Sequence, residues 1–213
     1  MKKEKFESSI GALYRRNEKF LFLSAGILFA SIFIGYFLSG IFSSFDQYFG
    51  TIFQELKEGV QKGEIKLETL PILINNIRVA LIIYGGGLLL GSFTAIFLFI
   101  NGAFIGYVIS KVPIGDFIIF TLPHGVIEIL AIIIAGAAGF RLAASVYYFI
   151  DGMLYKTWYG SIFEKIAFVF RENLDEFKES LLLLGISIVL LIIAAIIEAN
   201  ITLAWADYVR SII

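Results

Sequence analysis

The sequence contains no cysteine and only one histidine among its 213 residues. Without cysteine there can be no disulfide framework, no thiolate metal site and no thiol nucleophile. A single histidine also excludes a metal centre built from several histidines, and the HExxH, GxSxG and P-loop patterns are absent. We therefore expect no enzymatic activity and no cofactor.

Charged residues are also scarce. They make up 16% of the chain and hydrophobic residues 59%, against about 25% and roughly 45 to 50% in soluble domains. The apolar residues come in blocks of 18 or more without the alternation that a membrane barrel requires. The composition therefore predicts an all-α, polytopic transmembrane helical bundle, a single integral membrane domain over residues 1–213 with the lipid bilayer as its main partner.

The order of apolar and charged segments predicts about five spans joined by helices at the membrane surface. Nineteen mixed residues precede the first apolar run, so we interpret that run as a retained span and not a cleaved signal peptide. The predicted segments are an amphipathic cytoplasmic helix (1–19), a first span (20–42), an outer interfacial segment (43–70), core spans (72–140), a second interfacial segment (141–179) and a last span (181–203).

The core spans contain three predicted interruptions. A second span over about 72–99 is expected to end at Asn101-Gly102. Beyond it, the stretch from Lys111 to Gly125 carries two prolines, which predicts broken or re-entrant helices near 111–125. The span count therefore stays open between four and six.

Basic residues favour one orientation. Residues 1–19 carry six Lys or Arg, residues 141–179 carry five Lys or Arg beside six Asp or Glu, and 43–70 is acidic on balance. With five spans, the two basic-rich segments fall on the same side, which the positive-inside rule makes cytoplasmic. We expect a multi-pass protein of the cell membrane with a cytoplasmic amino terminus. The net charge of −1 predicts no nucleic-acid partner.

A few strongly polar residues lie within the apolar segments. Each costs about 2.5 to 3.5 kcal/mol on membrane-insertion scales, so such residues normally face the bundle interior and have partners. The candidate site residues are Asn76, Arg78, Asn101, His124, Glu128, Arg141 and Glu198.

His124 and Glu128 are four residues apart, on one helical face. One hypothesis places them in a proton relay, a cation site or a metal site, although two ligands are too few for a closed zinc site. The alternative is architectural: Glu128 bonds to His124, or to Arg78 and Asn76. For Glu198 the expected partners are Arg78 or Arg141.

Several motifs together resemble the stage II sporulation protein M family of integral membrane proteins. They are Asn75-Asn76, Asn101-Gly102, the hexapeptide from Pro123 to Glu128, the segment from Ala137 to Leu142, and the segment from Ala194 to Ala199. The resemblance covers about residues 70–202 and matches Asn76, Asn101, His124, Glu128, Arg141 and Glu198. It implies a small multi-span protein. Members from sporulating bacteria recruit or scaffold cell-wall hydrolases during engulfment.

Two functions remain open. The first is a non-enzymatic membrane scaffold, a homodimer that organises membrane or envelope partner proteins. The second is a small transporter or channel in which the intramembrane His, Glu and Arg residues pass ions or protons.

Overall fold

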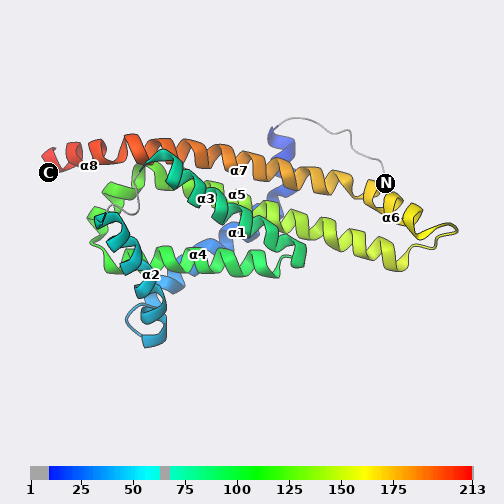
Figure 1. The fold of residues 1–213 in the computed structure, drawn as a ribbon, viewed down its shortest axis with the longest axis horizontal. Coiled ribbons are helices and arrows are strands. Elements are labelled where there is room, and N and C mark those ends of the chain that lie inside the picture. The colour runs from blue at the N-terminus through cyan, green and yellow to red at the C-terminus, as the bar shows by residue number, and fades with distance from the viewer. Residues whose placement is uncertain (1–9, 63–67, 213) are drawn as a thin grey trace.

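The computed structural model describes residues 10–62 and 68–212, and all regular structure within these ranges is helical (Figure 1). The elements are α1 (Ile10–Leu38), α2 (Ser43–Gln61), α3 (Thr69–Gly85), the 3-10 helix η1 (Gly86–Leu89), α4 (Ser92–Lys111), α5 (Ile114–Tyr155), α6 (Ile162–Glu172), α7 (Leu174–Asn200) and α8 (Thr202–Ile212).

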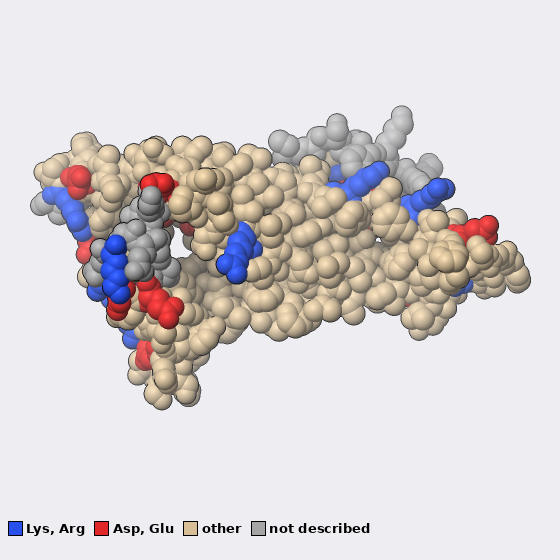
Figure 2. Space-filling view, viewed as in Figure 1, with Lys and Arg blue, Asp and Glu red and all other residues tan. Residues whose placement is uncertain are grey.

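Five of these helices are long and apolar enough to cross a membrane: α1, α3 continued by η1, α4, α5 and α7. This confirms the predicted fold class. Figure 2 shows charged side chains gathered toward the two ends of the molecule, with an apolar band between them. Because helices bury their backbone polar groups internally, such a band can sit in hydrocarbon.

Close helix packing holds α1 against α4. A Cβ on Gly35 would overlap the backbone of Ala103, and one on Gly106 would overlap the carbonyl oxygen of Ile32. Gly102 lies equally close to Ser31. Small residues let two membrane helices approach until their backbones touch, so this crossing depends on glycine.

Helix α1 differs from its prediction. Residues 10–19 continue directly into the span as one helix, instead of forming a separate surface helix; residues 1–9 of that predicted helix lie outside the described residues. No proline interrupts the junction, and Asn17 is fully buried against other helices. The helix ends at Leu38, four residues before the predicted end of the span, and Gly40 follows with a φ of +84°.

The turn between α3 and α4 lies at Leu90 and Gly91, not at Asn101-Gly102 as expected. Both residues have left-handed backbone, with φ of 54° and 80°. Asn101 and Gly102 lie inside α4. The glycine in that pair serves close packing on α1, which sequence alone does not distinguish from a turn.

Of the predicted interruptions near 111–125, one separates two helices. The chain leaves α4 at Lys111 and starts α5 just after Pro113. Pro123 lies inside α5 and does not break it. A membrane helix tolerates a proline because groups of neighbouring helices can bond to the backbone carbonyl that the proline leaves without a donor.

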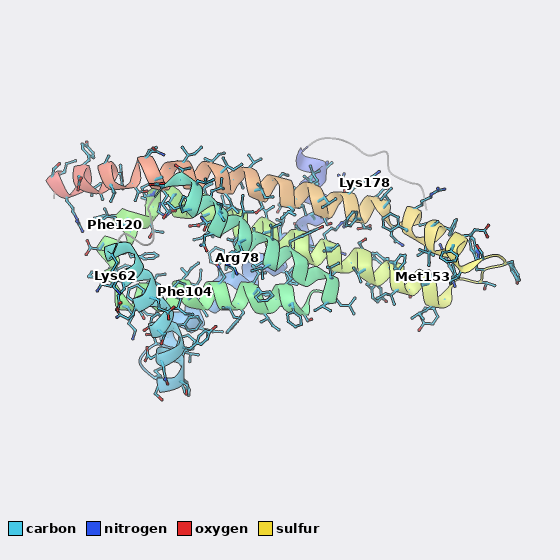
Figure 3. The ribbon with its side chains drawn as sticks, viewed as in Figure 1. Lys62, Arg78, Phe104, Phe120, Met153 and Lys178 are labelled. Atoms are coloured by element: carbon cyan, nitrogen blue, oxygen red, sulfur yellow. The ribbon has the colours of Figure 1, made fainter. Side chains whose placement is uncertain are left out.

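The segment 141–179, predicted to lie at the interface, comprises the end of α5, then α6 and the start of α7. These helices extend beyond α3 and α4 at one end of the molecule, where Met153 marks α5 and Lys178 marks the start of α7 (Figures 1 and 3). The 42 residues of α5 make a helix of about 63 Å, roughly twice the hydrocarbon thickness. A capping box between Ser161 and Glu164 starts α6.

Helix α2 lies at the opposite end, within the segment 43–70 that was predicted to be interfacial (Figure 1). Phe49 packs on Phe104 and Tyr107 of α4. Asp46 pairs with Lys111 at 2.8 Å, and this hydrogen bond holds the pKa of the Asp46 carboxyl below its usual value. The aromatic contact and the ion pair together tie α2 to the end of α4.

Candidate functional site

The predicted polar residues separate into three groups and one isolated arginine. Asn76, Asn101 and Glu128 line one cavity, His124 and Glu198 form a neighbouring pair, and Arg141 joins a third cluster. His124, Arg141 and Glu198 do not line the cavity.

The cavity has a volume of about 500 Å³ and lies between α1, α3, α4 and α5. It occupies the half of the bundle near α2, because it is lined by the first part of α3, the second part of α4 and the first part of α5. Phe104 marks its α4 wall in Figure 3. Its polar lining residues are Asn75, Asn76, Asn101, Thr121 and Glu128.

The polar groups of the cavity are only partly satisfied by the protein. The side-chain amide of Asn76 donates a hydrogen bond to Oε1 of Glu128. This is one of the contacts that the architectural hypothesis named. The side chains of Asn75 and Asn101 make no hydrogen bond with any described residue. Asn75 is exposed and Asn101 is partly buried, so both amides are open to an occupant of the cavity and can bind it.

His124 does not face this cavity. Its Nδ1 lies 3.1 Å from the hydroxyl oxygen of Thr202, and its Nε2 lies 3.9 Å from Oε2 of Glu198. The shared helical face with Glu128 therefore does not bring the two side chains into one cavity. The pair with Glu198 joins α5 to the end of α7, so Glu198 lies beside the histidine and not beside an arginine as we expected.

Arg141 forms the centre of a buried ionic cluster. Its Nη2 lies 2.7 Å from Oε2 of Glu179, and its Nε lies 2.8 Å from Oε2 of Glu176. Glu179 is 2% exposed and also accepts from Arg16 and, at 3.1 Å, from Asn17. The cluster joins α1, α5 and α7 near the α3–α4 turn, since Phe140 packs on Gly91.

Sequence reasoning missed Arg16, Asn17 and Glu179 as a group. It placed them in surface segments, because each lies just outside an apolar run. That position could have indicated an ionic contact, because a charge at the start of one span can reach a partner at the start of a neighbouring span.

Arg78 is exposed near the middle of α3 and has no hydrogen bond or ion pair with any described residue. Figure 2 shows one basic patch inside the apolar band, in the area where Figure 3 labels Arg78. On a membrane-facing surface this side chain has to reach a headgroup or another protein.

No further ligand is found for the metal site that was considered at His124 and Glu128. Within residues 10–62 and 68–212, no group of three or more His, Cys, Asp or Glu residues is arranged to hold a metal ion.

Comparison with known proteins identifies the family to which this sequence is similar. The family model described as "Stage II sporulation protein M" matches residues 20–203. Two uncharacterised proteins of Methanocaldococcus jannaschii are similar: one is 30% identical over 88% of this chain and 83% of its own length. The other is 33% identical over 64% of this chain and 72% of its own length. No solved structure matches.

Proposed function

This chain belongs to the stage II sporulation protein M family of membrane proteins, and with that premise we propose that it is a small transporter whose substrate occupies the cavity. The observation that carries the proposal is the pair of unpartnered amides, Asn75 and Asn101, beside Glu128 in a cavity of about 500 Å³. Membrane transporters place binding groups near the midplane between helices that can move relative to one another.

The other half of the bundle supports access from one side at a time. Ile83 and Leu98 have essentially no exposed surface there, and the cluster around Arg141 closes the contact between α1, α5 and α7. We assign the Arg141 cluster an architectural role: it holds the closed end. The function requires no bond-making chemistry, so we do not propose an enzyme.

A flux measurement tests this proposal. Purified protein in proteoliposomes is expected to pass at least one of protons, Na⁺, K⁺, chloride or an alkylamine faster than protein-free liposomes. Glu128→Gln is expected to reduce that flux by about tenfold, which corresponds to about 1.4 kcal/mol of lost binding. Glu58→Gln in the exposed part of α2 is the matched control. Equal flux in wild type and Glu128→Gln would exclude the role of the cavity.

The basic residues support an orientation. We propose that the amino terminus and α6 face the cytoplasm and that α2 and α8 face outward. Five spans put α6 on the amino-terminal side, and both segments on that side are rich in Lys and Arg. Residence in the cell membrane is part of the same proposal.

The second candidate is a scaffold acting as a homodimer. It is favoured by the exposed stripe on α3, which includes Ile74, Arg78, Leu81 and Ile82, and by the helices that project beyond the bundle. A single cysteine at Ile74 in this cysteine-free chain is expected to form a disulfide-linked dimer in membranes if α3 meets a second copy. Leu154→Cys, in the projecting part of α5, is the control.

A further inference from the structure

We propose that the cavity is entered sideways from the hydrocarbon, and that its occupant is a single-chain amphiphile whose headgroup donates hydrogen bonds through hydroxyl or ammonium groups. This inference rests on the proposed function only in using the same cavity. It adds the chemical class of the substrate and its route of entry.

The rim of the cavity is apolar and faces the membrane. Among the lining residues, Ile118, Leu122 and Val126 are 49%, 51% and 54% exposed. They are four residues apart along α5, so they form one stripe. They lie between the fifth and the thirteenth residue of α5, which is about 6 to 18 Å along the helix. That depth is inside a hydrocarbon layer of about 30 Å, so the rim meets lipid chains.

The surface beside the cavity is also recessed. Figure 2 shows a hollow between the α2 end and the central basic patch. This is the end of the bundle to which the lining residues of α3, α4 and α5 belong. An opening at this level exposes the cavity to molecules that are already dissolved in the membrane.

The interior combines long apolar walls with one polar wall. The walls include Leu28, Ile32, Phe104, Phe117 and Ile132, which suit a hydrocarbon chain. A volume of about 500 Å³ lies in the lower half of the range of about 300 to 1,000 Å³ typical of small-molecule sites. One chain with a small headgroup suits this space better than a lipid with two chains.

The polar wall selects the headgroup. Oε1 of Glu128 accepts from Asn76, and no hydrogen bond to Oε2 is formed by any described residue. The amides of Asn75 and Asn101 offer further donors and acceptors. A hydroxyl or ammonium group can donate to the free carboxylate oxygen and to the amide oxygens. A deprotonated phosphate or carboxylate headgroup has no proton to donate to these oxygens, so it would bind them less well.

Photolabelling of the full chain in lipid nanodiscs tests the inference. The probes are a diazirine-bearing alkylamine, alkylglycerol and alkyl phosphate with the same chain, and labelled peptides are identified by mass spectrometry. The alkylamine, the alkylglycerol or both are expected to label the α5 segment 117–132 about tenfold more than the alkyl phosphate does. The two favoured probes distinguish an ammonium from a hydroxyl headgroup.

Two tryptophan variants provide the matched comparison. Leu122→Trp fills the rim and is expected to reduce labelling about tenfold. Leu130→Trp is on the same helix at similar exposure, 49%, but does not line the cavity, and is expected to leave labelling unchanged. Asn101→Leu removes a polar wall group without blocking the rim and is also expected to reduce labelling. Thermal melting and gel filtration of each variant establish that it is folded, and Val126→Trp replaces Leu122→Trp if the latter does not fold.

Preferential labelling by the alkyl phosphate would overturn the inference, and so would equal effects of Leu122→Trp and Leu130→Trp. A third contrary result comes from competition: headgroup compounds without a chain would reduce labelling as strongly as the unlabelled amphiphiles do. The last result would mean entry from water. Labelling without flux would keep this inference and reject the transporter. Flux without labelling would keep the transporter and reject the amphiphile.

Discussion

Glu179 illustrates how a single residue can govern the closed end of the bundle. Its carboxylate is 2% exposed and accepts hydrogen bonds from Arg16, Asn17 and Arg141. Isolated charges in such surroundings are costly, but a carboxylate with two cations and an amide around it is compensated. The cluster is therefore stable only as a complete set.

Replacing Glu179 with alanine is expected to reduce stability by about 3 to 5 kcal/mol, because Arg141 would remain buried without its main acceptor. Denaturation in mixed micelles or steric trapping in bicelles measures this change. Glu172→Ala is the control, since Glu172 forms a half-exposed pair with Lys156, and such pairs contribute about 0 to 1 kcal/mol. Similar losses in both variants would contradict the assignment of the buried cluster.

Among the helices, the crossing of α1 and α4 depends on backbone contact. Ala at position 106 would place its Cβ against the carbonyl oxygen of Ile32 and the amide of Tyr36. These are backbone atoms, so they cannot move aside as a flexible side chain does, and α1 would have to shift away from α4.

Gly106→Ala is expected to destabilise the bundle by about 1 to 3 kcal/mol, the usual cost of overpacking. Gly26→Ala is the matched control, because nothing lies within 4 Å of a Cβ at Gly26 in α1. That change is expected to leave stability unchanged or to raise it by up to about 1 kcal/mol, since alanine favours helix. The free energy of unfolding is measured for both variants under the same conditions. An unchanged value for Gly106→Ala would mean that α1 and α4 are less closely packed than the structure shows.

The whole molecule has two chemically different ends separated by the apolar band. One end holds α6 and the buried Arg141 cluster, and the other holds α2 and α8 (Figure 1). Helix α7 is one of five helices long and apolar enough to cross a membrane, so we expect the loop before α6 and the start of α8 on opposite sides.

Single-cysteine labelling in intact cells tests this topology, and the cysteine-free chain needs no prior substitution. Tyr159→Cys, at a position that is 97% exposed, is expected to be protected from a membrane-impermeant maleimide. Lys62→Cys and Ile212→Cys are expected to react with it. Labelling of all three from one side would contradict the five-span arrangement, whereas reaction of Tyr159→Cys alone would keep the five spans and invert the proposed orientation.

The sequence by itself determined the membrane setting, the all-helical fold class and the family, whereas it left the number of spans open between four and six. These follow from local composition, because the cost of placing a residue in hydrocarbon depends mainly on that residue and its immediate neighbours along the chain. Of the partners that the architectural hypothesis offered Glu128, the structure shows Asn76.

Only the tertiary structure decided which partner each polar residue has. Arg141 meets Glu179 and not Glu198, His124 pairs with Glu198, and Gly102 packs on α1 instead of ending a helix. Each outcome depends on the rotation and crossing of helices that are far apart in sequence. Those angles are set by the packing of many small side chains together, which no single motif encodes.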